Sequence, residues 1–423
     1  MIRSVLFLYI CAFLVPSTAA QVLESVDPAV AGFDPARLSR IDTAIEAAVE
    51  ANEIPGAVAM IVRDGAVVYF KRFGYADVAD RKPMRKDSIF RIASMTKAIT
   101  TVSVLQLYER GHFLLSDPIS DFIPEFADPR IVVKVDDDGK IIETRPANKK
   151  IRIIDLLTHS SGIAYPFLPS ITSRAYVSAG IIDGVTSKPL VLEDNIKRIA
   201  EQPLEFEPAS AYRYGLSSDV LGYLVEVVSG QTLDDFFRAE ILEPLGMVDT
   251  FFYLPDAKAD RLVTLYADVN GNGISAATAD DVDIIIDNPN YPVEGAKTFF
   301  SGGVGLSATA VDYARFLQML LNGGELDGVR ILSRKSVELM TTSRIDMDGD
   351  GDPDFAMGFR VYDDLGEHTE LASPKSIYWG GAFHTYYWID PQERLIGIFM
   401  SQVRPANTTV AKRFSALMYQ ALR

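Results

Sequence analysis

The stretch FRIASMTKAITTVSVLQLYERG, residues 90–111, predicts a helix that is buried on most of its sides. From Met95 to Tyr108 nearly all side chains are apolar or small, and Gly111 is typical of a residue that ends a helix. Lys97 is the one charged residue in this run, three positions after Ser94. Because residues three apart share a helix face, we expect the lysine amine to lie within reach of the serine hydroxyl.

This Ser-x-x-Lys pair has the chemistry of an activated nucleophile. Ser94 stands at the start of the predicted helix, where free N–H groups and the helix dipole favour developing negative charge. Burial disfavours the charged form of a lysine, so Lys97 is placed to accept a proton from Ser94. The Ser-x-x-Lys pattern alone does not establish a nucleophile. A serine that caps the helix, followed by a lysine that extends to solvent, would show the same sequence pattern.

Residues upstream of this helix predict one more helix and a β-hairpin. Asp34 followed by proline is typical of a helix start, and the apolar residues after it recur at helical spacing. Strands are predicted at 57–62 and 66–73, because both are apolar and Asp64-Gly65 between them is typical of a hairpin turn.

The rest of the chain has a middle that is predicted to be helical and a C-terminal part rich in strands. From 117 to 300 the signals are mainly those of short helices and loops. A last helix is predicted after Asn407. Four strands are predicted before it, at 355–361, 376–379, 386–389 and 395–400.

Strands at both ends of the chain, with helices between them, predict an α/β (α+β) fold with two lobes. The strands would form one antiparallel sheet flanked by helices, built from about residues 30–93 and 301–423. An all-helical lobe, about residues 94–300, would be inserted into it. A cleft between two such lobes is a natural place for a site.

A second stretch of chemical interest is Tyr214-Gly215-Leu216. It precedes a helix that is expected to begin near Ser217. A phenol beside an ammonium group can act as an acid or a base. Taken alone, a tyrosine in such a loop is also compatible with a structural role.

The third stretch is Trp379-Gly380-Gly381-Ala382, at the end of a predicted strand. Consecutive glycines let the backbone approach a ligand closely. The backbone N–H of Ala382, together with that of Ser94, would then donate to an oxyanion. The structural alternative is a bulge at the end of the strand.

Together, the stretches around Ser94, Tyr214 and Trp379 resemble the class C β-lactamase-related serine hydrolases, and more closely the family VIII carboxylesterases. The resemblance runs from about residue 30 to the C-terminus. It implies a β-lactamase/transpeptidase-like fold and a two-step acyl transfer that requires no metal or organic cofactor. Four shorter stretches support it: FRIA at 90–93, DP at 117–118, LLTHSSG at 156–162 and SGGVGLS at 301–307.

The resemblance assigns a role to each motif. Ser94 would be the nucleophile, and Lys97 and Tyr214 would move its proton. The N–H groups of Ser94 and Ala382 would form the oxyanion hole. The residues expected to contact the substrate are Trp379, Gly380, Gly381 and Leu216.

Two departures from the family pattern bear on the substrate. Trp379 stands where β-lactamases usually carry lysine or histidine, and an indole cannot pair with the carboxylate of a β-lactam or peptide. Leu216 stands where asparagine is common, so an amide donor is missing. Both changes favour a serine hydrolase that cleaves neutral carboxylic esters through an acyl-enzyme on Ser94.

Other functions remain open at this point. A β-lactamase, a D,D-peptidase or a transesterase would use the same fold, and a non-catalytic penicillin-binding protein would share it as well. The α/β-hydrolase alternative needs a Gly-x-Ser-x-Gly elbow, and the sequence contains none.

The balance of charge argues against some partners. The 423 residues carry a formal net charge of -16, and no basic block interrupts the acidic surface. Such a chain repels phosphate backbones, so nucleic acid is not an expected partner. We expect a small-molecule ester or amide as substrate, and no stable insertion into a membrane.

Residues 1–20 are typical of a signal peptide. Arg3 is followed by an apolar run at 4–15 that is too short to cross a bilayer, and Pro16 then precedes small residues. Cleavage near Ala20 would release a periplasmic or secreted protein. The only cysteine, Cys11, lies in this segment, so the mature chain would hold no disulfide and no thiolate metal site.

Two acidic loops echo the spacing of a calcium loop. Asp346, Asp348 and Asp350 alternate before Gly351, with Asp354 beyond them, and Asp268, Asn270 and Asn272 repeat the pattern more weakly. Neither loop has glutamate at its twelfth position, and a solvated Asp-Gly turn is the alternative. A calcium ion at Asp346, Asp348, Asp350 and Asp354 would stabilise the fold and take no part in catalysis.

Overall fold

The computed structural model describes residues 23–268, 273–278, 286–362 and 370–423. The predicted signal peptide with Cys11 lies outside the described residues, and so do Asn270 and Asn272 of the second acidic loop. These predictions therefore stay predictions.

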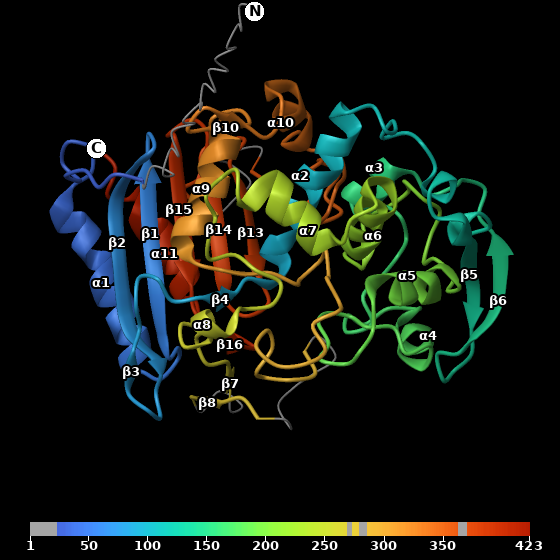
Figure 1. Cartoon of the computed structure of the whole chain (residues 1–423), viewed down its shortest axis with the longest axis horizontal. Coiled ribbons are helices and arrows are strands. Elements are labelled where there is room, and N and C mark those ends of the chain that lie inside the picture. Colours follow the sequence, from blue (N-terminus) through green and yellow to red (C-terminus); the bar gives the residue numbers. More distant parts are fainter. Residues whose placement is uncertain (1–22, 269–272, 279–285, 363–369) are drawn as a thin grey trace, which may run out of the picture.

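One seven-stranded antiparallel sheet forms the α/β lobe, and its strands come from both ends of the chain (Figure 1). The strand order is β12-β13-β14-β15-β1-β2-β3. Val58 of β1 lies opposite Arg72 of β2 on one side and Met400 of β15 on the other. The predicted antiparallel sheet is thus confirmed. The strands are β1 Gly56–Arg63, β2 Ala66–Asp77, β3 Lys82–Pro83, β12 Arg360–Val361, β13 Ile377–Gly381, β14 Thr385–Asp390 and β15 Leu395–Met400.

The strand predicted at 355–361 is wrong in its length, because only β12, Arg360–Val361, joins the sheet. Gly358 has a φ of +94°, a backbone conformation that breaks an extended run. Phe355 forms isolated bridges with Ile345 and Arg360 instead of pairing in the sheet. This loop carries Phe355 toward the site described below.

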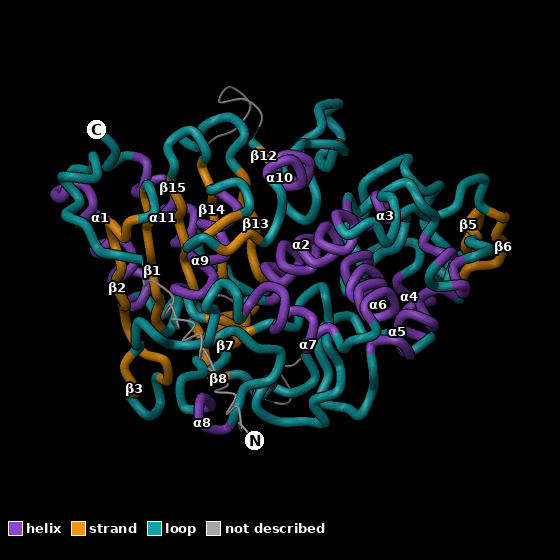
Figure 2. Tube along the Cα trace, turned by 45° about the horizontal axis from the view of Figure 1, so that its top comes forward, coloured by secondary structure: helices purple, strands orange, loops and turns teal. Residues whose placement is uncertain are grey.

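Helices cover both faces of the sheet (Figures 1 and 2). Side chains alternate along β1, so Ala57, Ala59 and Ile61 pack in the core with helices α1 (Pro35–Glu50) and α11 (Val410–Tyr419). The residues between them pack in the larger core with helices α9 (Ala310–Leu321) and α2 (Thr96–Glu109). The strand is therefore buried on both faces, which explains its nearly continuous apolar sequence.

The second lobe lies beside the sheet, on the right in Figure 1, and α2 leads into it. It is mainly helical, as predicted, but it also contains an antiparallel hairpin, β5 (Arg130–Val135) and β6 (Ile141–Pro146). Helix α2 packs against α6 and α7 of this lobe. The helices of the lobe are α3 Ile153–Leu157, α4 Ser173–Ser178, α5 Leu192–Ala200, α6 Ser217–Ser229 and α7 Leu233–Phe237, with a π-helical turn at Arg238–Leu242.

Short elements complete the described chain. Helix α8 is Asp256–Ala259 and α10 is Arg334–Met340, and 3-10 turns lie at Ala93–Met95, Ile119–Asp121 and Pro124–Phe126. Strand β16 pairs in parallel with β7, which joins the C-terminal segment to the middle of the chain. The remaining strands are β4 Phe90–Arg91, β7 Tyr266–Asp268, β8 Ile274–Ala276, β9 Ser307–Ala308, β10 Glu325–Leu326, β11 Val329–Arg330 and β16 Val403–Arg404.

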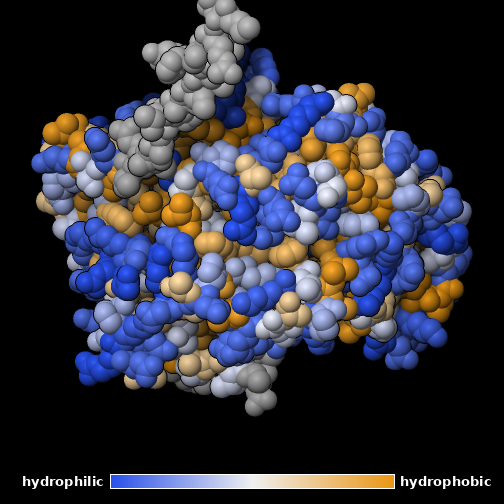
Figure 3. All heavy atoms as spheres, in the orientation of Figure 1, coloured by the Kyte–Doolittle hydropathy of each residue, from blue (hydrophilic) through white to orange (hydrophobic). Residues whose placement is uncertain are grey.

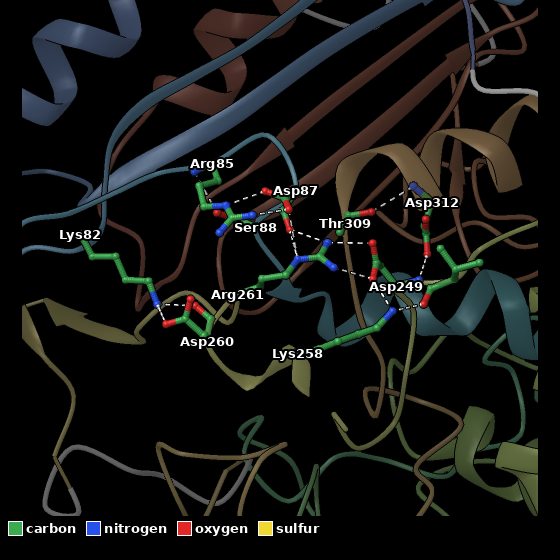
Figure 4. Close-up of polar contacts among 11 residues, drawn as sticks. Lys82, Arg85, Asp87, Ser88, Asp249, Lys258, Asp260, Arg261, Thr309 and Asp312 are labelled. Atoms are coloured by element: carbon green, nitrogen blue, oxygen red, sulfur yellow. Dashed lines mark hydrogen bonds and ion pairs between the residues drawn. The ribbon is translucent and has the colours of Figure 1, made fainter. Parts of the chain in front are cut away.

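A network of ion pairs holds residues 249–261 in place (Figure 4). Arg261 contacts both carboxylate oxygens of Asp249 at 2.7 Å and donates to the carbonyl oxygen of Asp87 at 2.7 and 2.9 Å. The Asp312 carboxylate, in the first turn of α9, accepts the N–H of Asp249 at 2.6 Å and the hydroxyl of Thr250 at 2.9 Å. The network thus connects the segment before β4 to α9.

The outer surface is mainly hydrophilic on the face that Figure 3 shows. Apolar side chains form smaller patches between the hydrophilic ones there. Within the described ranges, no helix is both long enough and apolar enough to cross a membrane.

Arg91, in β4 just before the turn that carries Ser94, is a buried cation held by carbonyl oxygens. It is 2% exposed, and its guanidinium donates to the backbone carbonyls of Tyr291 at 2.5 Å, Val263 at 2.9 Å and Pro289 at 2.6 Å. It also donates to the side-chain carbonyl of Gln402 at 3.2 Å. Burial lowers the pKa of Arg91 to about 9. One side chain therefore ties three segments, at Val263, at 289–291 and at Gln402, to the approach to Ser94.

The substitution Arg91→Met tests this role. It keeps an apolar stem but removes the donor of three backbone carbonyl groups, so we expect the free energy of unfolding to fall by about 3 kcal/mol in urea titrations. Arg394→Met is the matched control, because Arg394 pairs with Asp64 at the surface, and a change below about 0.5 kcal/mol is expected there. Equal, small changes in both variants would contradict this account of Arg91.

Candidate active site

Ser94 lies in the 3-10 turn that leads into α2, two residues before the helix itself begins. Its Oγ atom accepts a hydrogen bond from the Tyr214 hydroxyl at 2.7 Å and lies 3.1 Å from Lys97 Nζ. Ser94 is 8% exposed and Lys97 is fully buried. The structure therefore brings together the three residues that the sequence singled out as a catalytic group, although 120 positions separate Ser94 from Tyr214.

The amine of Lys97 has two further polar partners. It donates to the carbonyl oxygen of Gly303 at 2.9 Å and to the hydroxyl of Tyr165 at 3.1 Å. It also lies 4.8 Å from the ring centre of Tyr214 and 5.4 Å from that of Tyr165, within the range of a cation–π contact. All of these partners are uncharged in their ordinary states, so the amine sits in a polar but neutral cage.

Two titratable neighbours of the amine are held in their neutral forms. Burial, and then the charge of Lys97, lower the pKa of His159 well below its usual value. Burial raises the pKa of the Tyr165 phenol well above its usual value, and Tyr214 adds to the shift. His159 Nδ1 accepts the N–H of Gly215 at 3.3 Å, and its ring centre lies 5.0 Å from that of Tyr214. His159 thereby supports the loop that presents Tyr214.

The two glycines of the third stretch are needed for packing. A Cβ atom at Gly381 would lie 2.3 Å from the carbonyl oxygen of Ile92, and one at Gly380 would lie 2.7 Å from the Tyr386 ring. Only glycine lets the end of β13 lie against the turn that carries Ser94. Ala382 follows directly, and its place in an oxyanion hole with the N–H of Ser94 stays a prediction.

Aromatic rings line the region beside Tyr214. Trp379 makes edge contacts with Tyr214 and Phe355, at ring-centre distances of 5.6 and 5.4 Å. Tyr212 extends this wall, 5.0 Å from Phe355. Leu216, which was expected to contact substrate, is 1% exposed and packs in the main core. The prediction that Leu216 affects substrate choice therefore depends on the absence of an asparagine amide at this position, and not on a contact between its side chain and the substrate.

Sequence reasoning missed four residues of this region: Tyr165, Asp219, Gly303 and Phe355. Tyr165 stands three positions after the LLTHSSG stretch, and Gly303 lies within SGGVGLS, so both were near stretches that supported the resemblance. Phe355 ends the acidic loop, and Asp219 lies on the first turn of α6. Tyr165 and Gly303 contact Lys97, Phe355 contacts Trp379, and Asp219 contacts Gly303. No local pattern predicted these contacts, because the partners are remote in sequence.

The carboxylates predicted to bind calcium have protein partners. Arg360 forms ion pairs with Asp348 and with Asp354, the latter at 2.7 Å. Asp346 accepts the backbone N–H groups of Gly349 and Gly351. In the described part of the chain, no group of three or more His, Cys, Asp or Glu side chains is arranged to hold a metal ion. The calcium site stays a prediction.

The contact between Tyr214 and Ser94 is expected to set the reactivity of the serine. We predict that a fluorophosphonate probe labels Ser94 and that Tyr214→Phe slows the labelling by about 100-fold or more, because proton transfer at Oγ loses its partner. Tyr212→Phe is the matched control, since its ring contacts Phe355 and it makes no described contact with Ser94, and about wild-type labelling is expected. Equal rates in all three proteins would contradict the assignment.

Known proteins are similar to this chain in sequence and in fold. The chain is 31% identical to Esterase EstB of Burkholderia gladioli over 86% of its own length and 91% of the relative's. It is 30% identical to Lovastatin esterase of Penicillium rubens, with 85% and 91% covered. The solved structure of EstCE1, a hydrolase with promiscuous acyltransferase activity, superposes with a TM-score of 0.76 at 26% identity, over 92% of this chain and 98% of that chain.

A family model also matches this sequence. The model described as Beta-lactamase matches residues 41–421, which include every residue of the site built above. The chain therefore belongs to the beta-lactamase family and is a serine hydrolase.

Proposed function

We propose that this protein cleaves carboxylic esters through an acyl-enzyme on Ser94. The observation that carries the proposal is the triangle of Ser94, Lys97 and Tyr214, with Oγ 3.1 Å from the amine and 2.7 Å from the phenol. These distances suit direct proton transfer in both directions. The relatives named esterases support the same class of substrate.

The first half of the reaction is acylation. Ser94 Oγ attacks the ester carbonyl carbon while its proton passes to Lys97 or, through Tyr214, to the departing alkoxide. The new C–O bond forms as the bond to the alcohol breaks, and the alcohol leaves with the proton. Burial of the amine strengthens each of these electrostatic contacts, because little water competes for them.

The second half is hydrolysis of the acyl-enzyme. A water molecule attacks the same carbonyl carbon, gives up a proton to the Lys97–Tyr214 pair, and releases the acid as the proton returns to Ser94 Oγ. In both halves the oxyanion would be held by the N–H groups of Ser94 and Ala382. The reaction as proposed uses only groups of this chain.

Neutral esters are the substrates that the site favours. Trp379 packs edge-on against Tyr214. By the family resemblance, this apolar ring takes the place of the cation that would meet a substrate carboxylate. An anionic β-lactam or peptide terminus would lose its water there without gaining a partner. The net charge of -16 opposes anionic substrates further.

A paired kinetic assay tests the proposal. Purified protein should hydrolyse p-nitrophenyl acetate and p-nitrophenyl butyrate and leave nitrocefin nearly untouched. Ser94→Ala, which keeps the fold and removes the nucleophile, should lower ester turnover by about 1,000-fold or more. Rapid nitrocefin turnover would point to a β-lactamase and against the weight placed on Trp379. Without Ser94-dependent turnover of any substrate, a binding protein would be the better hypothesis.

We also propose that the protein is exported, on the pattern of residues 1–20. Bacterial expression of the full chain should yield a periplasmic or secreted protein whose first residue is Ala20 or Gln21 by N-terminal sequencing. Leu8→Arg places a charge in the apolar run and should leave the chain uncleaved in the cytoplasm. Full-length wild-type protein found only in the cytoplasm would contradict export.

A further inference from the structure

A buried carboxylate stands behind the catalytic amine. Asp219, in the first turn of α6, is 2% exposed, and its Oδ1 atom accepts the hydroxyl of Ser301 at 2.6 Å and the N–H of Gly303 at 3.4 Å. The same Ser301 oxygen accepts the N–H groups of Gly303 at 3.2 Å and Val304 at 3.1 Å. Asp219 and Ser301 together hold the backbone of the turn at 301–304 from one side.

Helix α2 holds the same turn from the other side. Thr100 donates its hydroxyl to the carbonyl of Gly302 at 2.6 Å, and Lys97 donates to the carbonyl of Gly303 at 2.9 Å. Thr100 and Lys97 are three residues apart and so share a helix face. The 301–303 segment therefore runs between α2 and α6. The N–H of Gly303 meets the carboxylate on α6, and the carbonyl groups of Gly302 and Gly303 meet the Thr100 hydroxyl and the Lys97 amine on α2.

The segment is packed too closely for larger residues. A Cβ atom at Gly303 would lie 2.6 Å from the second oxygen of Asp219 and 3.1 Å from the Tyr165 hydroxyl. A Cβ atom at Gly302 would lie 2.5 Å from the carbonyl oxygen of Ser218. The close fit fixes the Gly303 carbonyl, and with it the position of Lys97 Nζ relative to Ser94.

Asp219 is also the acidic group that interacts with the amine through space. Burial raises the pKa of Asp219, while the hydrogen bond from Ser301 and the charge of Lys97 lower it. The other groups around Lys97 are Ser94 on its own helix, Tyr165 and His159 from the loops after α3, and Tyr214 before α6. The charge of Asp183 also raises the pKa of the Tyr165 phenol. No described carboxylate forms an ion pair with Lys97 directly.

From this geometry we propose that Asp219 is the positioning residue and counter-charge of Lys97, acting through Ser301 and the Gly303 backbone. The charges of Asp219 and Lys97 act on each other across this turn, so the carboxylate stabilises the positive charge that the amine gains when it takes the proton of Ser94. Ser301 and the Gly303 backbone position the amine, because they fix the Gly303 carbonyl, which accepts a hydrogen bond from Lys97 Nζ. This inference rests on the acyl-transfer chemistry proposed above, but not on the choice of ester.

The test measures the rate of fluorophosphonate labelling of Ser94 against pH, beside the hydrolysis of p-nitrophenyl butyrate. Asp219→Asn keeps an oxygen that accepts from Ser301 and removes the negative charge. At low pH we expect the labelling rate to rise with pH, and we call this part of the profile the acidic limb. Because Asp219→Asn removes a negative charge near the amine, we expect the acidic limb to move to lower pH by about half to one pH unit. Ser301→Ala keeps the charge and breaks the contact, so we expect labelling about tenfold slower with the limb in place.

Asp312→Asn is the matched control. Asp312 is also a buried acid, 3% exposed, whose pKa burial raises to about 6, but it lies in the network of Figure 4 and contacts Asp249 and Thr250. We expect this variant to lose thermal stability and to keep the wild-type labelling profile. Circular dichroism on every variant shows whether it is folded.

The outcomes separate this inference from the proposed function. An Asp219→Asn profile that superposes on the wild type overturns the role of the charge, whatever the substrate. If that variant does not fold, wild-type labelling by Ser301→Ala overturns the proposal and slower labelling supports it. Labelling of Ser94 without any ester turnover would refute the proposed substrate class and leave the result for Asp219 standing.

Discussion

The fully buried amine of Lys97 is the constraint on which the rest of the site depends. A cation placed in an apolar helix must find polar partners, because an isolated buried charge is very costly. Here the partners come from three separate segments: the turn at Ser94, the loop at Tyr165 and the 301–303 segment with Gly303. The helical lobe and the sheet lobe are therefore brought together at one atom, and the reactive serine lies where they meet.

The sheet supplies the rigid side of this arrangement. The centre of the sheet is the pairing of β1 with β15. Strand β13, separated from β15 by β14, ends with Gly381 packed against the carbonyl of Ile92. Arg91, three residues before Ser94, binds carbonyl groups of three other segments, at Val263, at 289–291 and at Gln402. Such a turn has little freedom to move, as a preorganised nucleophile requires.

Local patterns predicted the parts of the structure that depend on neighbours in sequence. The spacing of Ser94 and Lys97 predicted their contact, and two apolar runs joined by an Asp-Gly turn predicted β1 and β2. The strand at 355–361 was wrong because Gly358 breaks the extended run, and the hairpin β5–β6 was missed. Contacts of Tyr165, Gly303 and Asp219 with the site depend on how distant segments pack, so no local pattern contained them. Family resemblance, not spacing, connected Tyr214 and Trp379 to Ser94.

The pairing of β1 with β15 also governs the order in which the chain can fold. Val58 meets Met400, so the central pair of the sheet joins residues from opposite ends of the sequence. A ribosome must release almost the whole chain before that pair can form, and the early hairpin has an unpaired edge until then. Such an edge is a template for aggregation. Loss of the last few dozen residues would remove β15 and α11, so a shortened chain has no route to a reduced but intact sheet lobe.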